Sequence, residues 1–175
     1  MPTAIIPARG GSKRIPRKNI REFCGKPMIA WSIRSAIQSG CFDQVIVSTD
    51  DPQIAEISQQ YGATTPFVRP AQLSDNYTPT TPVVIHALRW LSAHGKQPDD
   101  HTCCIYATNP FLEPNDIQLG FQKLQDPGRA LVLPTTSSPS PIPRALTLDA
   151  TGRITLVDPN SLHSRSHAPV GSFHD

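Results

Sequence analysis

The chain has 175 residues, of which 38% are hydrophobic and 17% charged, with 19 prolines; this composition predicts one folded domain over residues 1–175 with stiff loops, not a disordered chain. A formal net charge of +2 excludes a generally polycationic protein. No apolar run approaches the ~20 residues of a membrane helix, and no signal pattern opens the chain, so we predict a cytoplasmic protein without a membrane partner.

The first predicted elements are two strands with a helix between them. Residues 3–7 (TAIIP) and 44–48 (QVIVS) are short apolar runs typical of buried strands. Residues 26–40 predict a helix that Gly40 ends. Its apolar positions recur at helical spacing and predict an inner face formed by Ile29, Ile33, Ala36 and Ile37.

Residues 51–68 continue the alternation. Residues 51–62 predict a helix with Asp51 as its N-cap and Pro52 behind it, and residues 64–68 predict a short extended segment. Asp50 ends the preceding strand, where ligands bind in parallel sheets, but Asp50 and Asp51 are equally typical of helix caps. Both interpretations of Asp50 stay open.

Later segments repeat the pattern. Residues 81–95 and 113–125 predict helices, and residues 102–107 and 130–134 predict strands. The inner face of the first of these helices is predicted to contain Val84, Ala87, Leu88 and Leu91. Such alternation predicts an α/β fold with a mainly parallel sheet covered by helices on both faces. Ligand sites in such sheets lie beyond the carboxyl ends of the strands.

From about residue 137 the pattern changes. Residues 137–158 predict a Pro-rich linker and a β-hairpin around the DATG sequence at 149–152. The four cysteines show neither zinc-binding nor redox spacing, and we expect buried free thiols.

The loop after the first strand is strongly basic. We call residues 7–19 (PARGGSKRIPRKN) the basic loop; its cations are Arg9, Lys13, Arg14, Arg17 and Lys18. Because the positive charge is concentrated there while the whole chain is nearly neutral, the loop predicts an anion site.

Two well-known phosphate-binding motifs are excluded. Gly10 and Gly11 are followed by Ser12, with no third glycine in the register of a dinucleotide-binding fingerprint. Gly25-Lys26 is followed by Pro27, and Ile20 stands where a P-loop requires its first glycine.

A triphosphate fits the remaining features of the loop. Gly10 and Gly11 allow close backbone approach to an anion, and backbone N–H groups together with Ser12 can donate hydrogen bonds to it. Arg9 and Lys18 can add charge-assisted hydrogen bonds of roughly 1.5–3 kcal/mol each.

Several segments carry a family resemblance. Residues 5–20 (IIPARGGSKRIPRKNI) and 25–33 (GKPMIAWSI) resemble the signature of the CMP-sugar synthetases, the acylneuraminate cytidylyltransferase family. Residues 45–63, 69–80 and 106–112 extend the resemblance along the chain. It implies a Rossmann-like three-layer nucleotidyltransferase fold, and it identifies the hairpin of residues 137–158 as similar to the family's dimerisation arm, so a homodimer is expected.

The resemblance also implies the roles of individual residues. Catalytic roles fall to Arg9 and Lys18, which would bind the CTP phosphates together with Ser12 and Asn19. The remaining nucleotide-binding positions are Pro7, Ala8, Gly10, Gly11, Arg69, Thr78 and Thr80. The segment that lines the sugar site contains Tyr106, Thr108 and Asn109.

The implied reaction is transfer of CMP from CTP to a nonulosonic acid, with release of pyrophosphate. Residues 106–110 (YATNP) differ from the Gln-Pro-Thr-Ser-Pro pattern of sialic acid members, which favours pseudaminic acid. The family's cofactor is Mg²⁺; its usual carboxylates, in an Asp-x-Asp segment, are expected beyond Asp175, so no metal ligand is assigned here.

Alternatives stay open. One is a cytidylyltransferase for sialic acid or 3-deoxy-manno-octulosonate. The other is a polyanion-binding module without chemistry. Nucleic acid is not an expected partner, because no aromatic residues alternate with the cations of the loop.

Overall fold

The structure, a computed structural model, describes residues 2–12, 15–96, 101–137, 146–148, 154–156 and 173–174. Two compact units make up the chain, residues 1–127 and 128–175. The organisation as one domain stays a prediction. No helix within the described residues is long and apolar enough to cross a membrane.

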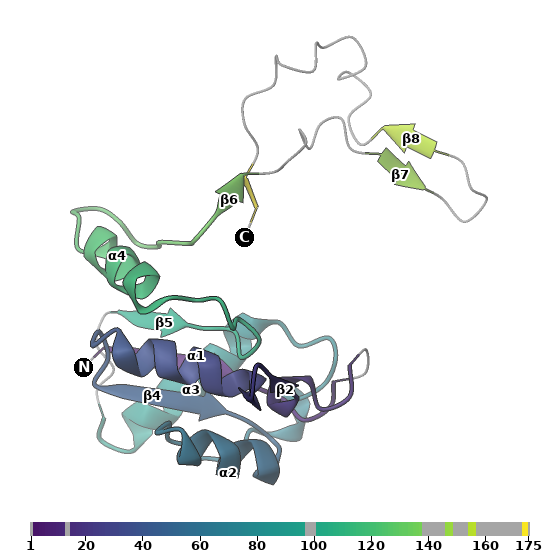
Figure 1. The fold of residues 1–175 in the computed structure, drawn as a ribbon. Coiled ribbons are helices and arrows are strands. Elements are labelled where there is room, and N and C mark those ends of the chain that lie inside the picture. Colours follow the sequence, from purple (N-terminus) through teal and green to yellow (C-terminus); the bar gives the residue numbers. More distant parts are fainter. Residues whose placement is uncertain are drawn as a thin grey trace. The chain divides into compact units, whose positions relative to one another are not determined.

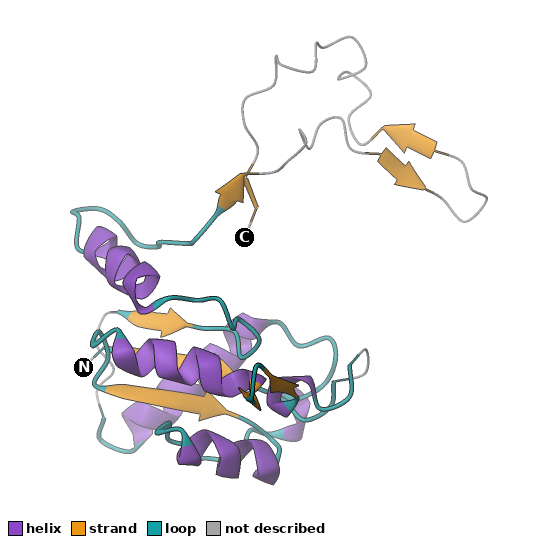
Figure 2. Ribbon diagram, viewed as in Figure 1, coloured by secondary structure: helices purple, strands orange, loops and turns teal. Residues whose placement is uncertain are grey.

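A three-stranded parallel sheet forms the centre of the first unit (Figures 1 and 2). Its strand order is β4 (Gln44–Ser48), β1 (Thr3–Pro7), β5 (Thr102–Cys104), so the first strand is the central one. Isolated parallel bridges extend the sheet beyond β4, pairing Ile46 with Thr64 and Thr49 with Val68. The predicted α/β fold, its parallel sheet and the extended segment at 64–68 are confirmed.

Helices cover both faces of the sheet. Ala4 and Ile6 of β1 belong to one buried cluster with Ile29 of α1 (Met28–Gln38). On the other face, α3 (Thr80–Ala93) contacts β1; Figure 1 shows α1 in front of the sheet and α3 behind it. Because successive side chains of β1 point to opposite faces of the sheet, the strand packs against helices on both faces.

The inner face of α1 agrees with the prediction except at one position. Ile29, Ile33 and Ala36 are buried, but the Ile37 side chain is 46% exposed. Ile37 lies at the edge of the apolar stripe, where its Cδ1 is near Gly62 at the end of α2 (Pro52–Gln60). The prediction that Ile37 faces inward is wrong.

Helix α3 buries two of its four predicted inner residues, Ala87 and Leu91. Its buried residues are Val83, Ala87 and Leu91, whereas Val84 and Leu88 are only half-buried. The helix is apolar on more than one side, so periodicity does not select a single face. Packing against β1 makes that selection.

Short elements complete the first unit: η1 (Lys18–Ile20), β2 (Glu22–Phe23), β3 (Lys26–Pro27), η2 (Ala71–Leu73) and α4 (Pro114–Leu124). The hairpin of β2 and β3 turns at Cys24 and Gly25, whose φ angles are both positive at 48° and 75°. Two-residue hairpin turns of this kind require such angles.

Among its described residues, the second unit has two antiparallel strand pairs. β7 (Leu146–Leu148) pairs with β8 (Ile154–Leu156), as expected of the predicted hairpin, and β6 (Thr136–Ser137) pairs with β9 (Phe173–His174). The predicted turn at 149–152 lies outside the described residues.

The predicted strand at residues 130–134 is not formed. Leu131 and Leu133 are 71% and 59% exposed. An apolar run forms a buried strand only where a neighbouring strand accepts its hydrogen bonds, and the described pairings provide none for this segment.

The cysteines are free, as predicted, but they are not all buried. Cys24 and Cys104 are exposed, so the prediction of buried thiols is wrong for these two, and Cys41 and Cys103 are only half-buried. Burial, followed by the neighbouring Cys104 and Cys41, raises the pKa of Cys103 to about 11.

Candidate active site

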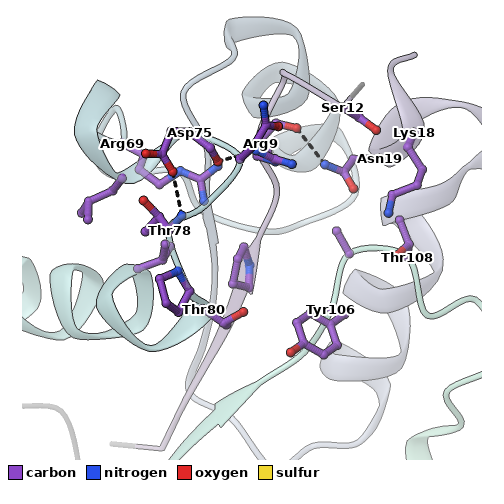
Figure 3. A pocket seen from close by; sticks show the side chains of 16 residues that line it. Arg9, Ser12, Lys18, Asn19, Arg69, Asp75, Thr78, Thr80, Tyr106 and Thr108 are labelled. Atoms are coloured by element: carbon purple, nitrogen blue, oxygen red, sulfur yellow. Dashed lines mark hydrogen bonds between the residues drawn. The ribbon is translucent and has the colours of Figure 1, made fainter. Parts of the chain in front are cut away.

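A cleft lies beyond the carboxyl ends of the strands, where three segments meet. These are the basic loop after β1, the segment leading from the β4 edge into α3, and the residues that follow β5 (Figure 3). The predicted residues that line it are Pro7, Arg9, Ser12, Lys18, Asn19, Arg69, Thr78, Thr80, Tyr106 and Thr108. Parallel strands bring these distant positions together because their carboxyl ends share one edge of the sheet.

Other predicted site residues do not line the cleft. Ala8 is buried in the hydrophobic core, where its backbone N–H donates to the Ser48 carbonyl at 2.9 Å. Asn109 is exposed, next to a segment that Ser32 holds through a hydrogen bond to the Tyr106 carbonyl at 2.9 Å. Gly10 and Gly11 also lie outside the lining.

The two glycines of the basic loop have different surroundings. The Gly10 N–H donates to Asp50 Oδ1 at 3.0 Å. A Cβ added at Gly10 would lie 2.5 Å from Asp51 Oδ2, whereas one added at Gly11 would meet nothing within 4 Å. In the structure, Gly10 allows the carboxylates at the end of β4 to approach the loop closely.

Arg9 joins two walls of the cleft. Its Nη1 donates to the backbone carbonyl of Asp75, and its own carbonyl accepts a hydrogen bond from Asn19 Nδ2 at 2.9 Å. Figure 3 shows Arg9 between Asp75 on one side and Asn19 on the other. The Asn19 amide thus holds the loop itself, a contact that the sequence does not reveal.

The Arg17 side chain does not line the cleft, because it binds a carboxylate outside it. It forms an ion pair with Asp51, with a second contact from Nη2 to Oδ1 at 3.1 Å. Asp51 also caps α2 by accepting from the N–H groups of Gln53 and Ile54 at 2.9 and 3.1 Å. The hydrogen bond from Arg17 is the largest cause that holds the pKa of Asp51 below its usual value.

The cations that line the cleft from the basic loop are therefore Arg9 and Lys18 among the described residues. Lys13 and Arg14 lie outside the described residues. Lys18 opens η1, directly after Arg17, which has a left-handed backbone with φ of 54°.

Arg69 adds a third cation from the opposite wall. Its residue is 4% exposed, and Nε donates to Ser74 Oγ at 3.2 Å. Nη2 lies 3.5 Å from Asp50 Oδ1. Burial lowers the pKa of Arg69, but the ordinary value is so far above neutrality that the guanidinium stays charged.

The sequence analysis missed the role of Asp75. Its Oδ1 accepts from the N–H groups of Tyr77 and Thr78 at 2.9 and 2.6 Å, which shapes the turn that faces Arg9. Hydrogen bonds from Thr78 and Tyr77 hold the pKa of Asp75 low. The Ser-Asp-Asn sequence at 74–76 is a turn signal that could have indicated this role. The cleft is also lined by Asn76 and Pro79, within residues 69–80 that carry the family resemblance, and by Leu73, Val83 and Ala107, which were not predicted individually.

No preformed metal centre is found among the described residues. They contain no group of three or more His, Cys, Asp and Glu side chains able to hold one. No step of the chemistry is therefore assigned to Mg²⁺.

Comparisons with known proteins agree with this geometry. A family model described as "Cytidylyltransferase" matches residues 3–144. Pseudaminic acid cytidylyltransferase of Campylobacter jejuni is 43% identical over 171 residues, which cover 98% of this chain and 73% of that protein. CMP-N,N'-diacetyllegionaminic acid synthase of Legionella pneumophila is 39% identical over 132 residues, covering 74% of this chain and 55% of that protein.

A solved structure is similar as well. That of CMP:2-keto-3-deoxy-manno-octonic acid synthetase complexed with CTP has a TM-score of 0.61 and 26% identity. The match covers 78% of this chain and 51% of that one.

Proposed function

The chain belongs to the cytidylyltransferase family, and we propose that this enzyme transfers CMP from CTP to a nonulosonic acid, with pseudaminic acid as the favoured acceptor. The observation that carries the proposal is the convergence of Arg9, Lys18 and Arg69 on one cleft at the carboxyl ends of the strands. A triphosphate with about four negative charges suits this positive cleft, with Arg9 and Lys18 assigned to its phosphates.

The proposed reaction needs positioning and charge stabilisation. The anomeric hydroxyl oxygen of the sugar attacks the α-phosphorus of CTP, the bond from that phosphorus to the bridging oxygen breaks, and pyrophosphate leaves. The hydroxyl proton passes to solvent. Arg9 and Lys18 stabilise the negative charge that builds up on the phosphate oxygens.

The nucleotide and the sugar occupy different walls in this proposal. Arg69, Thr78 and Thr80 lie on the wall assigned to cytosine and ribose, with the backbone of Pro7 beside them. Tyr106 and Thr108, which follow β5, are assigned to the sugar. The Tyr106 residue is 61% exposed, so its ring is available to a bulky substituted sugar.

Pseudaminic acid is favoured because the relative named for it matches 98% of this chain, whereas the legionaminic acid relative matches 74%. The similarity to the 3-deoxy-manno-octonic acid synthetase supports CTP as the nucleotide and leaves that sugar as an alternative acceptor. We further propose a homodimer, with the β7–β8 hairpin as part of its dimerisation arm, and a cytoplasmic location.

Thermal unfolding with different ligands tests the nucleotide. We expect CTP to raise the melting temperature more than ATP or single-stranded DNA at moderate salt. Equal stabilisation by all three ligands, disappearing as salt is added, would instead support the polyanion-binding module.

Product analysis tests the acceptor. The chain would be incubated with CTP, Mg²⁺ and one of four sugars: pseudaminic, legionaminic, sialic or 3-deoxy-manno-octulosonic acid. Mass spectrometry should then find a CMP adduct chiefly of pseudaminic acid. Preferential formation of another adduct would reject pseudaminic acid as the acceptor while keeping the reaction class.

A further inference from the structure

We propose that Asp50 is a positioning residue that fixes the basic loop and Arg69 through a single carboxylate oxygen. This inference rests on the proposed function, because it concerns the geometry of the CTP-binding cleft. Asp50 itself does not line that cleft.

The two contacts of Asp50 reach opposite walls. Its Oδ1 accepts a hydrogen bond from the Gly10 N–H at 3.0 Å, next to Arg9. The same oxygen lies 3.5 Å from Arg69 Nη2. Because Arg9 and Arg69 both line the cleft, this one oxygen sets the position of one wall against the other.

Helix capping does not explain Asp50. Asp51 makes both capping hydrogen bonds of α2, to Gln53 and Ile54. The carboxylate of Asp50 contacts Gly10 and Arg69 instead. The two adjacent aspartates therefore have separate tasks.

The burial of Arg69 makes its dependence on Asp50 strong. Its side chain is 3% exposed, and Nη2 is a buried nitrogen without a hydrogen bond among the described residues. A buried cation without a balancing charge is strongly disfavoured. Without the Asp50 charge, the Arg69 guanidinium would be drawn toward solvent or toward the cleft, away from its present geometry.

The test compares carboxamide variants of the 175-residue chain. Asp50→Asn keeps an oxygen for the Gly10 N–H but removes the charge that faces Arg69. We expect its Kd for CTP, measured by calorimetry, to rise at least tenfold, with the KM for CTP rising and the KM for the sugar unchanged. Asp43→Asn is the matched control, because Asp43 is exposed just before β4 while Asp50 follows the strand; its Kd should equal that of the parent chain.

A double variant separates positioning from loss of folding. Arg69→Gln removes the buried charge, so Asp50→Asn added to it should change the CTP Kd less than twofold. The Asp50→Asn/Arg69→Gln chain should also regain the melting temperature that Asp50→Asn alone loses. This comparison remains informative if Asp50→Asn alone does not fold, because the double variant then has to fold and bind CTP as Arg69→Gln does.

The outcomes distinguish the two proposals. If the parent chain does not bind CTP, the proposed function fails. If the parent binds and Asp50→Asn binds equally well, or if Asp50→Asn weakens binding tenfold even beside Arg69→Gln, the proposed function stands and the positioning role through Arg69 is overturned.

Discussion

Gly10 and Gly11 show how two identical neighbouring residues acquire different roles. Gly11→Ala should leave stability nearly unchanged, because the added Cβ meets nothing within 4 Å. Gly10→Ala should destabilise by about 1–3 kcal/mol, as expected of overpacking, because the Cβ would displace the Asp51 carboxylate. Urea unfolding of both variants checks this difference, and equal losses of stability would contradict it.

Asp51 gives a pH-dependent prediction. Its pKa is lowered in the folded state, chiefly by Arg17, so its contribution to stability is present above the ordinary Asp pKa of about 3.9 and is lost as the pH falls through the lower folded value. Asp51→Asn can still cap α2 but loses the ion pair, which should cost about 0.5–1 kcal/mol near neutral pH. The difference in stability between the parent chain and the variant should disappear at acidic pH.

The measurement for Asp51 is the melting temperature of parent and variant from pH 7 down to pH 2.5. Subtracting the two curves removes the titration of all other carboxylates that the variants share. An offset that stays constant down to pH 2.5 would contradict a charge effect and assign the loss to the cap alone.

Single residues also show what the sequence could predict about the site. Arg9, Lys18 and Arg69, the cations to which the family resemblance gives a role, all line the cleft. The partners of Arg17 and Asn19 could not be predicted. Arg17 pairs with a residue 34 positions away and Asn19 with a backbone carbonyl, and neither contact leaves a spacing signal.

At the scale of elements, the helix caps and the parallel sheet were predictable from the sequence, but the buried faces of the helices were not always so. The N-cap of α2 was predictable, since Asp followed by Pro at the first helical position is a local signal. On α3, Ala87 and Leu91 were predicted correctly, but Val84 was predicted in place of Val83, because the two residues are equally apolar. The run at 130–134 shows the same limit, because apolar composition does not provide a pairing partner.

The face of α3 can be tested with a matched pair of leucines. Leu91→Ala should destabilise by about 2–5 kcal/mol, because Leu91 is fully buried and its loss leaves a cavity. Leu88→Ala should cost about 1 kcal/mol, because that side chain is only half-buried. Equal costs in urea unfolding, or a larger cost at Leu88, would favour the inner face that the periodicity predicts.

For the whole molecule, the cleft and the division into two units lead to a prediction about a fragment. Every residue that lines the cleft lies before Thr108 or at it, within the unit of residues 1–127. We therefore expect a chain ending at Pro127 to fold cooperatively and to keep CTP binding within about threefold of the 175-residue chain, since compact units can fold independently. The fragment is not expected to transfer CMP to the sugar, because it lacks the β7–β8 hairpin that we propose as part of the dimerisation arm.

Circular dichroism and a CTP titration check the fragment. Saturating CTP at about 100 times Kd should stabilise it by about 2.7 kcal/mol, as for any ligand that binds only the folded state. The same fragment with Lys18→Met is the control: it should fold equally well and lose most of this stabilisation, because Lys18 faces the cleft. A folded fragment that CTP does not stabilise, beside a full chain that it does, would show that residues 128–175 complete the nucleotide site.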